Sequence, residues 1–123
     1  MAITDVATSE TIDLIASDKV EGTAVYNHRR DRLGTIHNFM VNKRTGQVQY
    51  AVLSFGGLLG IGAEFYPLPW DKLTYDLDQG GYLVDLDRAV LDKAPRYAAG
   101  QDAPFDDAYG RQVNDYYGVE YRP

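Results

Sequence analysis

The chain has 123 residues, which suits one domain, and its hydrophobic fraction of 45% is enough for one compact core. It contains no cysteine and therefore forms no disulfide, and its formal net charge of −6 would repel nucleic acids. The sequence contains no run of about 20 apolar residues, which is the length that crosses a bilayer. Its N-terminal segment has neither the basic start nor the apolar stretch of a signal peptide. We therefore expect a cytoplasmic protein with no membrane insertion and no nucleic-acid partner.

The first half of the chain predicts three strands. Segments rich in β-branched and aromatic residues cover 23–27, 32–41 and 47–55. Gly34 lies inside the second segment and indicates a bulge or a sharp bend. The third segment has apolar residues at both odd and even positions, so both of its faces are expected to be buried and the strand to be central.

The second half predicts shorter strands. We expect strands at 64–68, 73–77 and 82–86, and the segment 78–81 between the last two has the composition of a tight turn. One helical turn is expected at 70–73, directly after the proline that ends the preceding strand.

Two helices are expected near the C-terminus. Asp87 can begin a short helix that continues to Lys93, and Pro95 stops it. A terminal helix is expected over 106–117, and Gly118 is suited to end it. Its apolar residues recur at helical spacing, which predicts a docked face.

These elements predict a mainly β fold. About six short strands with one late helix indicate a small antiparallel β-barrel of about six strands, with a short helix and a C-terminal helix. We divide the chain into a flexible N-terminus at 1–11, a barrel domain at 12–95, and a linker with a C-terminal helical tail at 96–123.

Five linked motifs carry a resemblance to a known family. They are Val20-x-Gly22-x-x-Val25-Tyr26-Asn27, Leu33-Gly34-x-Ile36, the segment from Thr45 to Gly57, Leu59-Gly60-Ile61-Gly62, and Pro69-Trp70-x-x-Leu73-x-Tyr75. Over residues 14–86 the chain resembles the PRC-barrel domain, which also occurs in the photosynthetic reaction-centre H subunit, in a ribosome maturation factor and in stand-alone bacterial proteins. The resemblance implies a protein-binding barrel that often self-associates and is not an enzyme.

The residues themselves predict no catalytic, cofactor or metal site. The glycine-rich segment 56–62 lacks the lysine, the hydroxyl and the following helix of a phosphate loop. The spacing from Asp76 to Asp87 mimics a calcium loop, but Gly80 stands where a third side-chain ligand belongs and strands replace the flanking helices. His28 and His37 have no recognisable nucleophile to activate, and the chain has no cysteine.

Basic side chains form two clusters. The first consists of Arg29, Arg30 and Arg32, and the second of Lys43 and Arg44. Consecutive turns of a meander lie at opposite ends of the strand they share. The two clusters are therefore expected to lie apart and not to form one nucleic-acid stripe.

Seven apolar and aromatic residues are candidates for an interaction surface. They are Phe55, Leu58, Leu59, Ile61, Trp70, Tyr116 and Tyr117. Leu58, Leu59 and Ile61 lie between glycines, and an exposed cluster of this kind marks a binding surface. The alternative is that this loop folds over an open barrel end and buries them, and the sequence supports both equally. Trp70 is expected to plug one end of the core. Tyr116 and Tyr117 are expected to dock the terminal helix on the barrel of their own chain or on that of a neighbouring chain.

The function expected from these features is a non-catalytic interaction or assembly module. We expect it to form a homodimer or to bind another protein, because only this function explains the apolar loop. The alternative is a small-ligand-binding barrel, or a minor enzyme that uses the barrel mouth. A pocket lined by convergent polar groups would favour that alternative.

Overall fold

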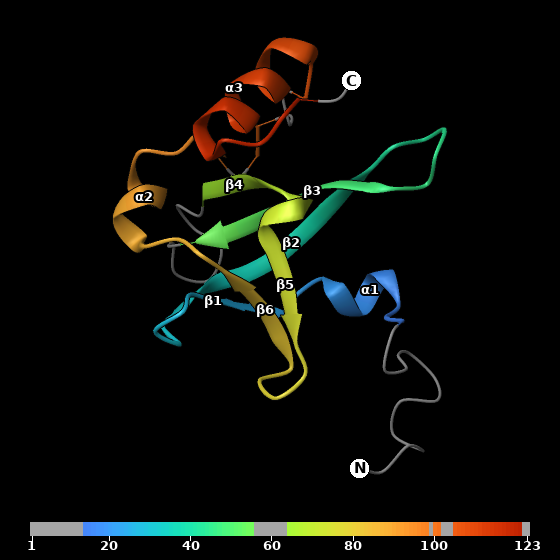
Figure 1. Cartoon of the computed structure of the whole chain (residues 1–123). Coiled ribbons are helices and arrows are strands. Elements are labelled where there is room, and N and C mark those ends of the chain that lie inside the picture. The colour runs from blue at the N-terminus through green and yellow to red at the C-terminus, as the bar shows by residue number, and fades with distance from the viewer. Residues whose placement is uncertain (1–13, 56–63, 99, 102–104, 122–123) are drawn as a thin grey trace.

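The computed structural model describes residues 14–55, 64–98, 100–101 and 105–121 of the chain. Seven strands form one sheet in the order β5-β6-β1-β2-β3-β4-β7 (Figure 1). The strands are β1 (Ala24–Tyr26), β2 (Arg32–Val41), β3 (Val48–Phe55), β4 (Glu64–Pro69), β5 (Leu73–Asp76), β6 (Gly81–Val84) and β7 (Tyr97–Ala98). The helical elements are α1 (Ser17–Val20), the 3-10 turn η2 (Trp70–Lys72), α2 (Arg88–Asp92) and α3 (Asp107–Tyr117).

The strand pairing differs in part from the antiparallel barrel of six strands expected from the sequence. β1 and β6 are parallel, with Val25 opposite Tyr82, whereas the five other pairings are antiparallel. The chain leaves β4 through η2 and crosses to the far edge of the sheet, so that the β5–β6 hairpin brings β6 alongside β1 in the same direction. The sheet is therefore mixed, and no ladder joins β5 to β7 in the part of the chain that the structure describes.

A second difference concerns β7. The sequence predicts a linker from residue 96 onward, but Tyr97 and Ala98 pair with Phe65 and Glu64 of β4. A strand of two residues has no periodicity of its own. It forms here because the edge of β4 offers unpaired backbone groups.

The central position expected for β3 is confirmed, since β3 lies between β2 and β4. Ala51, Val52 and Leu53 are each at most 1% exposed, so both faces of the strand are covered. Gly34 of β2 approaches β3 closely, and a Cβ at this position would collide with the carbonyl oxygen of Ser54. Glycine is therefore required where the two strands come together.

The terminal helix is also confirmed, within one residue of the expected bounds. Asp106 caps α3 by accepting a hydrogen bond from the backbone N–H of Tyr109 at 2.8 Å. Gly118 ends the helix in the left-handed conformation, with φ of 69°. Val113 is fully buried against the body of the protein, and α3 lies across β4 in Figure 1.

A polar contact fixes the register of α3 on the sheet. The Tyr50 hydroxyl donates to Oδ1 of Asn114 at 2.8 Å, and Nδ2 of Asn114 donates to the carbonyl oxygen of Glu120 at 3.0 Å. Both side chains are buried, so each polar atom needs its partner. Of the helices in the described ranges, none is both long and apolar enough to cross a membrane.

Candidate interaction surface

One end of the sheet gathers residues from β3, β4, α2 and α3. Phe55 and Glu64 form the last pair of the β3–β4 ladder, so both strands end at the same edge. Residues 56–63 connect them and lie outside the described part of the chain, and with them the predicted residues Leu58, Leu59 and Ile61.

Phe55 lies at the border between the core and this end. Its ring is 5.9 Å from that of Tyr66 in an edge-on contact. The Arg88 guanidinium lies 5.4 Å from the centre of the Phe55 ring, and Arg88 also donates to the carbonyl oxygen of Arg32 at 2.7 Å. The first residue of α2 thereby covers the half-buried ring and ties α2 to the start of β2.

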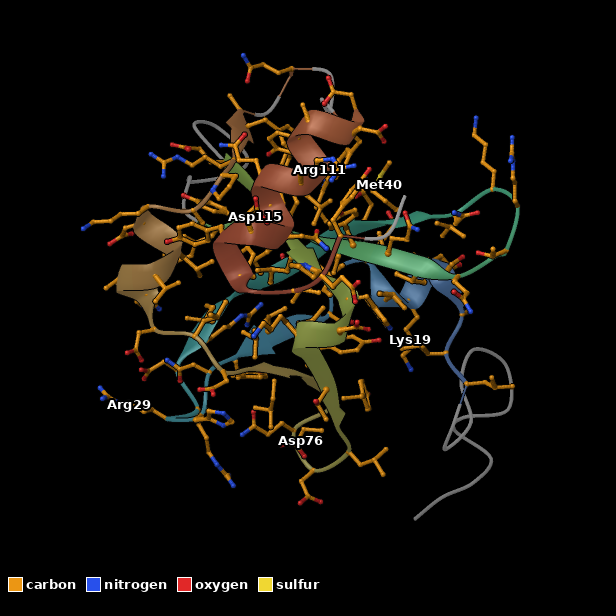
Figure 2. All side chains as sticks on the ribbon, turned by 45° about the horizontal axis from the view of Figure 1, so that its top comes forward. Lys19, Arg29, Met40, Asp76, Arg111 and Asp115 are labelled. Atoms are coloured by element: carbon orange, nitrogen blue, oxygen red, sulfur yellow. The ribbon has the colours of Figure 1, made fainter. Side chains whose placement is uncertain are left out.

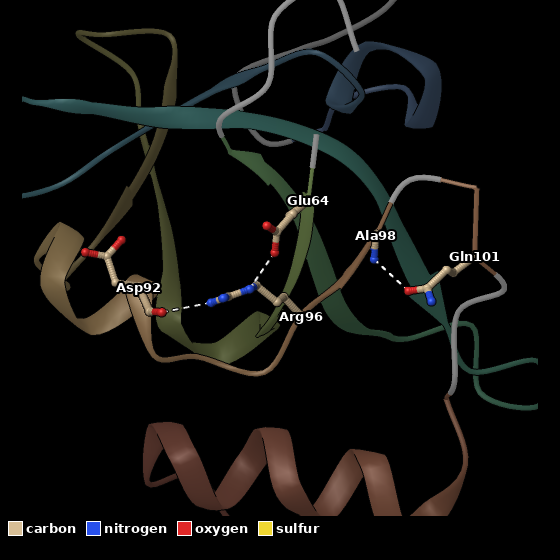
Figure 3. A network of polar contacts seen from close by, with 5 residues as sticks. All are labelled: Glu64, Asp92, Arg96, Ala98 and Gln101. Carbon is tan, nitrogen blue, oxygen red and sulfur yellow. Dashed lines mark hydrogen bonds and ion pairs between the residues drawn. The ribbon is translucent and has the colours of Figure 1, made fainter. Parts of the chain in front are cut away.

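Arg96 connects β4 to α2 in a similar way (Figure 3). Its Nε lies 2.5 Å from a carboxylate oxygen of Glu64, and its Nη1 donates to the carbonyl oxygen of Asp92 at 2.8 Å. The paired side chains are 40% and 42% exposed, and a pair this exposed contributes at most about 1 kcal/mol. The contact therefore orients α2 more than it stabilises the fold.

The exposed apolar part of this end consists of Val90 on α2 and Tyr116 on α3. They are 36% and 38% exposed, and the Tyr116 hydroxyl donates to the Val90 carbonyl oxygen. A shallow open groove runs beside Tyr116, between α3 and residues 93–96, which follow α2, and its rim includes Arg111 and Asp115, both labelled in Figure 2. We call Phe55, Arg88, Val90, Arg96 and Tyr116 the α2–α3 surface.

The structure brings together only some of the candidate residues. Phe55 and Tyr116 both belong to the α2–α3 surface, whereas Tyr117 is 6% exposed and lies in the core. Trp70 lies at the opposite end of the β3–β4 ladder, about 17 Å away along the strands at 3.3 Å per residue. Its ring contacts those of Phe39 and Tyr82 at 6.4 and 5.6 Å, which is the geometry expected of a plug for the core.

A comparison with protein families identifies the domain. A sequence model of the PRC-barrel domain matches residues 12–91, more than half of the chain. The chain belongs to the PRC-barrel family. Among curated proteins, none matches it. The matched segment includes β1 to β6 but ends before α3, so the α2–α3 surface combines PRC-barrel residues with the C-terminal tail.

Sequence reasoning missed the α2 contribution to this surface of the PRC-barrel. The short helix after Asp87 was expected, and its bounds agree closely with α2. The contacts of Arg88 with Phe55 and of Val90 with Tyr116 join residues that are far apart in the chain. No local pattern signals such contacts, so only the structure could place Val90 beside Tyr116.

The two histidines lie in ordinary structural contacts. His28 Nε2 is 3.2 Å from Asp85, with the two side chains 64% and 86% exposed. The His37 ring stacks on Phe65 at 4.1 Å. Within the described ranges, no three His, Cys, Asp or Glu side chains come together as a possible metal site. The expectation of a non-catalytic protein without a metal or cofactor stays a prediction.

Two tyrosines of α3, the half-buried Tyr109 and the buried Tyr117, have raised pKa values. Burial, with a smaller contribution from Tyr97, raises the pKa of Tyr109 to about 12. Burial is also the main cause of the raised pKa of Tyr117, to which Tyr116, Tyr109 and Tyr66 add. Neither hydroxyl has a hydrogen-bond partner in the described part of the chain. Both phenols are therefore neutral at physiological pH and unsuited to act as bases.

The two basic clusters lie apart, as expected. Arg32 begins β2 and Val41 ends it, so the clusters are separated by about 30 Å along a ten-residue strand. Figure 2 shows Arg29 at the β1–β2 turn, well away from Met40 near the other end of β2. The arrangement offers no continuous basic stripe between these two clusters.

Proposed function

We propose that this PRC-barrel protein is a non-catalytic interaction or assembly module that self-associates as a homodimer. The observation that carries the proposal is the exposed pair of Val90 and Tyr116 on the α2–α3 surface. Phe55 belongs to this surface and pairs with Glu64, and the chain between these two residues contains Leu58, Leu59 and Ile61. Large apolar side chains from three segments can thus contribute to one contact.

Burial of Val90 and Tyr116 alone does not provide enough free energy for a stable dimer. Burial of one aliphatic or aromatic side chain contributes about 1.5–3 kcal/mol, and a two-fold interface uses each side chain twice. Association itself costs about 4–15 kcal/mol in lost freedom of motion. We therefore include Leu58, Leu59 and Ile61 in the proposed interface. We also propose a cytoplasmic setting, since a chain without cysteine does not depend on an oxidising compartment.

The test compares aspartate substitutions at two exposed apolar positions. Val90→Asp places a charge in the proposed interface, and we expect a folded monomer by sedimentation velocity. Leu77 is 64% exposed on the β5–β6 turn, away from the surface, so Leu77→Asp is a matched control that should remain dimeric. The double variant Leu58→Asp/Ile61→Asp should also be monomeric.

The opposite results would move or remove the interface. If Leu77→Asp dissociates the dimer and Val90→Asp does not, the contact lies elsewhere. If Leu58→Asp/Ile61→Asp unfolds the protein, those residues belong to the core and only α2 and α3 remain for the interface. The alternative function, binding of a small ligand, has a candidate cleft at the opposite end of the sheet.

A further inference from the structure

A polar cleft lies at the end of the β3–β4 ladder opposite the α2–α3 surface. Its volume is about 230 Å³, and it is enclosed by the start of β3, by η2 and by the residues around the C-terminal end of α3. Trp70 forms an aromatic part of its wall, and the buried side chains of Tyr50 and Asn114 also line it. None of these groups belongs to the proposed dimer interface, so the cleft is independent of that proposal.

The polar groups of the cleft fall into two sets. Tyr50 and Asn114 are paired with each other, and Asn42 is occupied by the backbone N–H groups of the β2–β3 turn. In contrast, no hydrogen bond or ion pair within the described ranges engages the side chains of Gln47, Gln49, Asp71 or Glu120. The first set builds the cleft, and the second set is available to a ligand.

The charge of the lining selects the kind of ligand. Asp71 and Glu120 are the charged residues among those that line the cleft, and the described lining contains no lysine, arginine or histidine. An anion would meet two carboxylates without a compensating charge, whereas a cation would be attracted. Among the described residues no three His, Cys, Asp or Glu side chains come together, so the cleft lacks the several carboxylates typical of a calcium site. The indole of Trp70 can contact an apolar stem or a cationic head group.

We propose that this cleft binds an organic cation, namely a primary ammonium or guanidinium group on a short aliphatic stem. At about 230 Å³ the cleft has room for several water-sized groups, which is enough for a short aliphatic stem and its charged head. Asp71 and Glu120 neutralise the charged head, and the side-chain amide oxygens of Gln47 and Gln49 accept hydrogen bonds from its remaining N–H groups. The same chemistry is found in free alkylamines and in basic side chains of a partner chain.

The test is an NMR titration of the full chain with n-butylammonium chloride at constant ionic strength. We expect saturable shifts confined to the Trp70 indole N–H and to the backbone amides near Gln47, Asp71 and Glu120. A millimolar Kd would bring the site close to saturation at about 50 mM ligand. 1-Butanol has the same stem without the charge and should give no saturable shifts. A parallel titration with N-acetyl-lysine amide and N-acetyl-arginine amide distinguishes the sources, since tighter binding of these amides indicates a partner side chain.

Two double variants connect the binding to the carboxylates. Asp71→Asn/Glu120→Gln should weaken n-butylammonium binding by about twofold to thirtyfold, the range for loss of two exposed ion pairs. Asp18→Asn/Asp78→Asn removes the same charge from exposed positions outside the cleft and should leave the Kd unchanged. The proposal is overturned by absent saturable shifts, by equal shifts with 1-butanol, or by equal affinity of the two variants. If the NMR spectrum of the double variant shows that it is not folded, the single variants Asp71→Asn and Glu120→Gln replace it in the same titration.

Discussion

Tyr50 and Tyr117 both have buried hydroxyl groups, but only the Tyr50 hydroxyl has a hydrogen-bond partner within the described residues. The effect of this difference on stability can be measured. The Tyr50 hydroxyl donates to Asn114, and both side chains are buried. Tyr50→Phe removes the donor and leaves a buried amide oxygen without a partner. We expect the free energy of unfolding in urea to fall by about 1–3 kcal/mol. An unchanged value would show that water replaces the lost donor.

Tyr117 provides the contrasting case. Its side chain is 6% exposed, and its hydroxyl has no hydrogen-bond partner in the described part of the chain. Tyr117→Phe removes a buried polar group without breaking a bond, so the free energy of unfolding should stay the same or rise. A fall comparable to that of Tyr50→Phe would mean that the hydroxyl is bonded in solution, for example to a buried water.

The raised pKa of Tyr109 predicts weaker folding at alkaline pH. Burial raises this pKa from 10.0 to about 12 in the folded state, so between these values the unfolded chain loses a proton that the folded chain keeps. The free energy of unfolding should therefore decrease as pH rises from about 10 to about 12. Urea unfolding at about pH 9 and about pH 11 measures this decrease. Tyr109→Phe should reduce it, and an equal decrease in this variant would refute the assignment.

At the scale of elements, the docked helix α3 makes the clearest prediction. Val113 is fully buried between α3 and the sheet, and Val113→Ala removes about two methylene equivalents from that contact. We expect docking to weaken by about 2 kcal/mol, which hydrogen exchange would report as faster exchange across α3 than in β3. Exchange that is already fast throughout α3 in the wild type would contradict docking.

The elements also show what the sequence could predict. β2, β3 and α3 agree closely with the expected bounds, because their composition, alternation and caps are local signals. The parallel pairing of β1 with β6 and the two-residue strand β7 arise from long-range contacts, which have no such signal. Phe55 and Tyr116 could be named from the sequence as candidate interaction residues because they are apolar or aromatic. Arg88 and Val90 of α2 could not, because their contacts with Phe55 and Tyr116 are long-range.

At the scale of the whole molecule, two sites lie at opposite ends of the β3–β4 ladder. The α2–α3 surface is half apolar and carries arginines, whereas the cleft beside Trp70 is polar and acidic. In our account the first binds a second copy of the chain and the second binds a cation. Because the two sites share no residue, ligand in the cleft should leave the monomer–dimer equilibrium unchanged. Sedimentation velocity with and without n-butylammonium chloride at equal ionic strength checks this independence.

Sedimentation equilibrium of the wild-type chain measures the proposed self-association without any variant. The measurement covers loading concentrations from low to high micromolar at physiological salt. We expect a weight-average mass that rises with concentration toward twice the mass of one chain, and that stays at the monomer mass for Val90→Asp. A wild-type mass equal to that of one chain at every concentration would show that the chain does not dimerise.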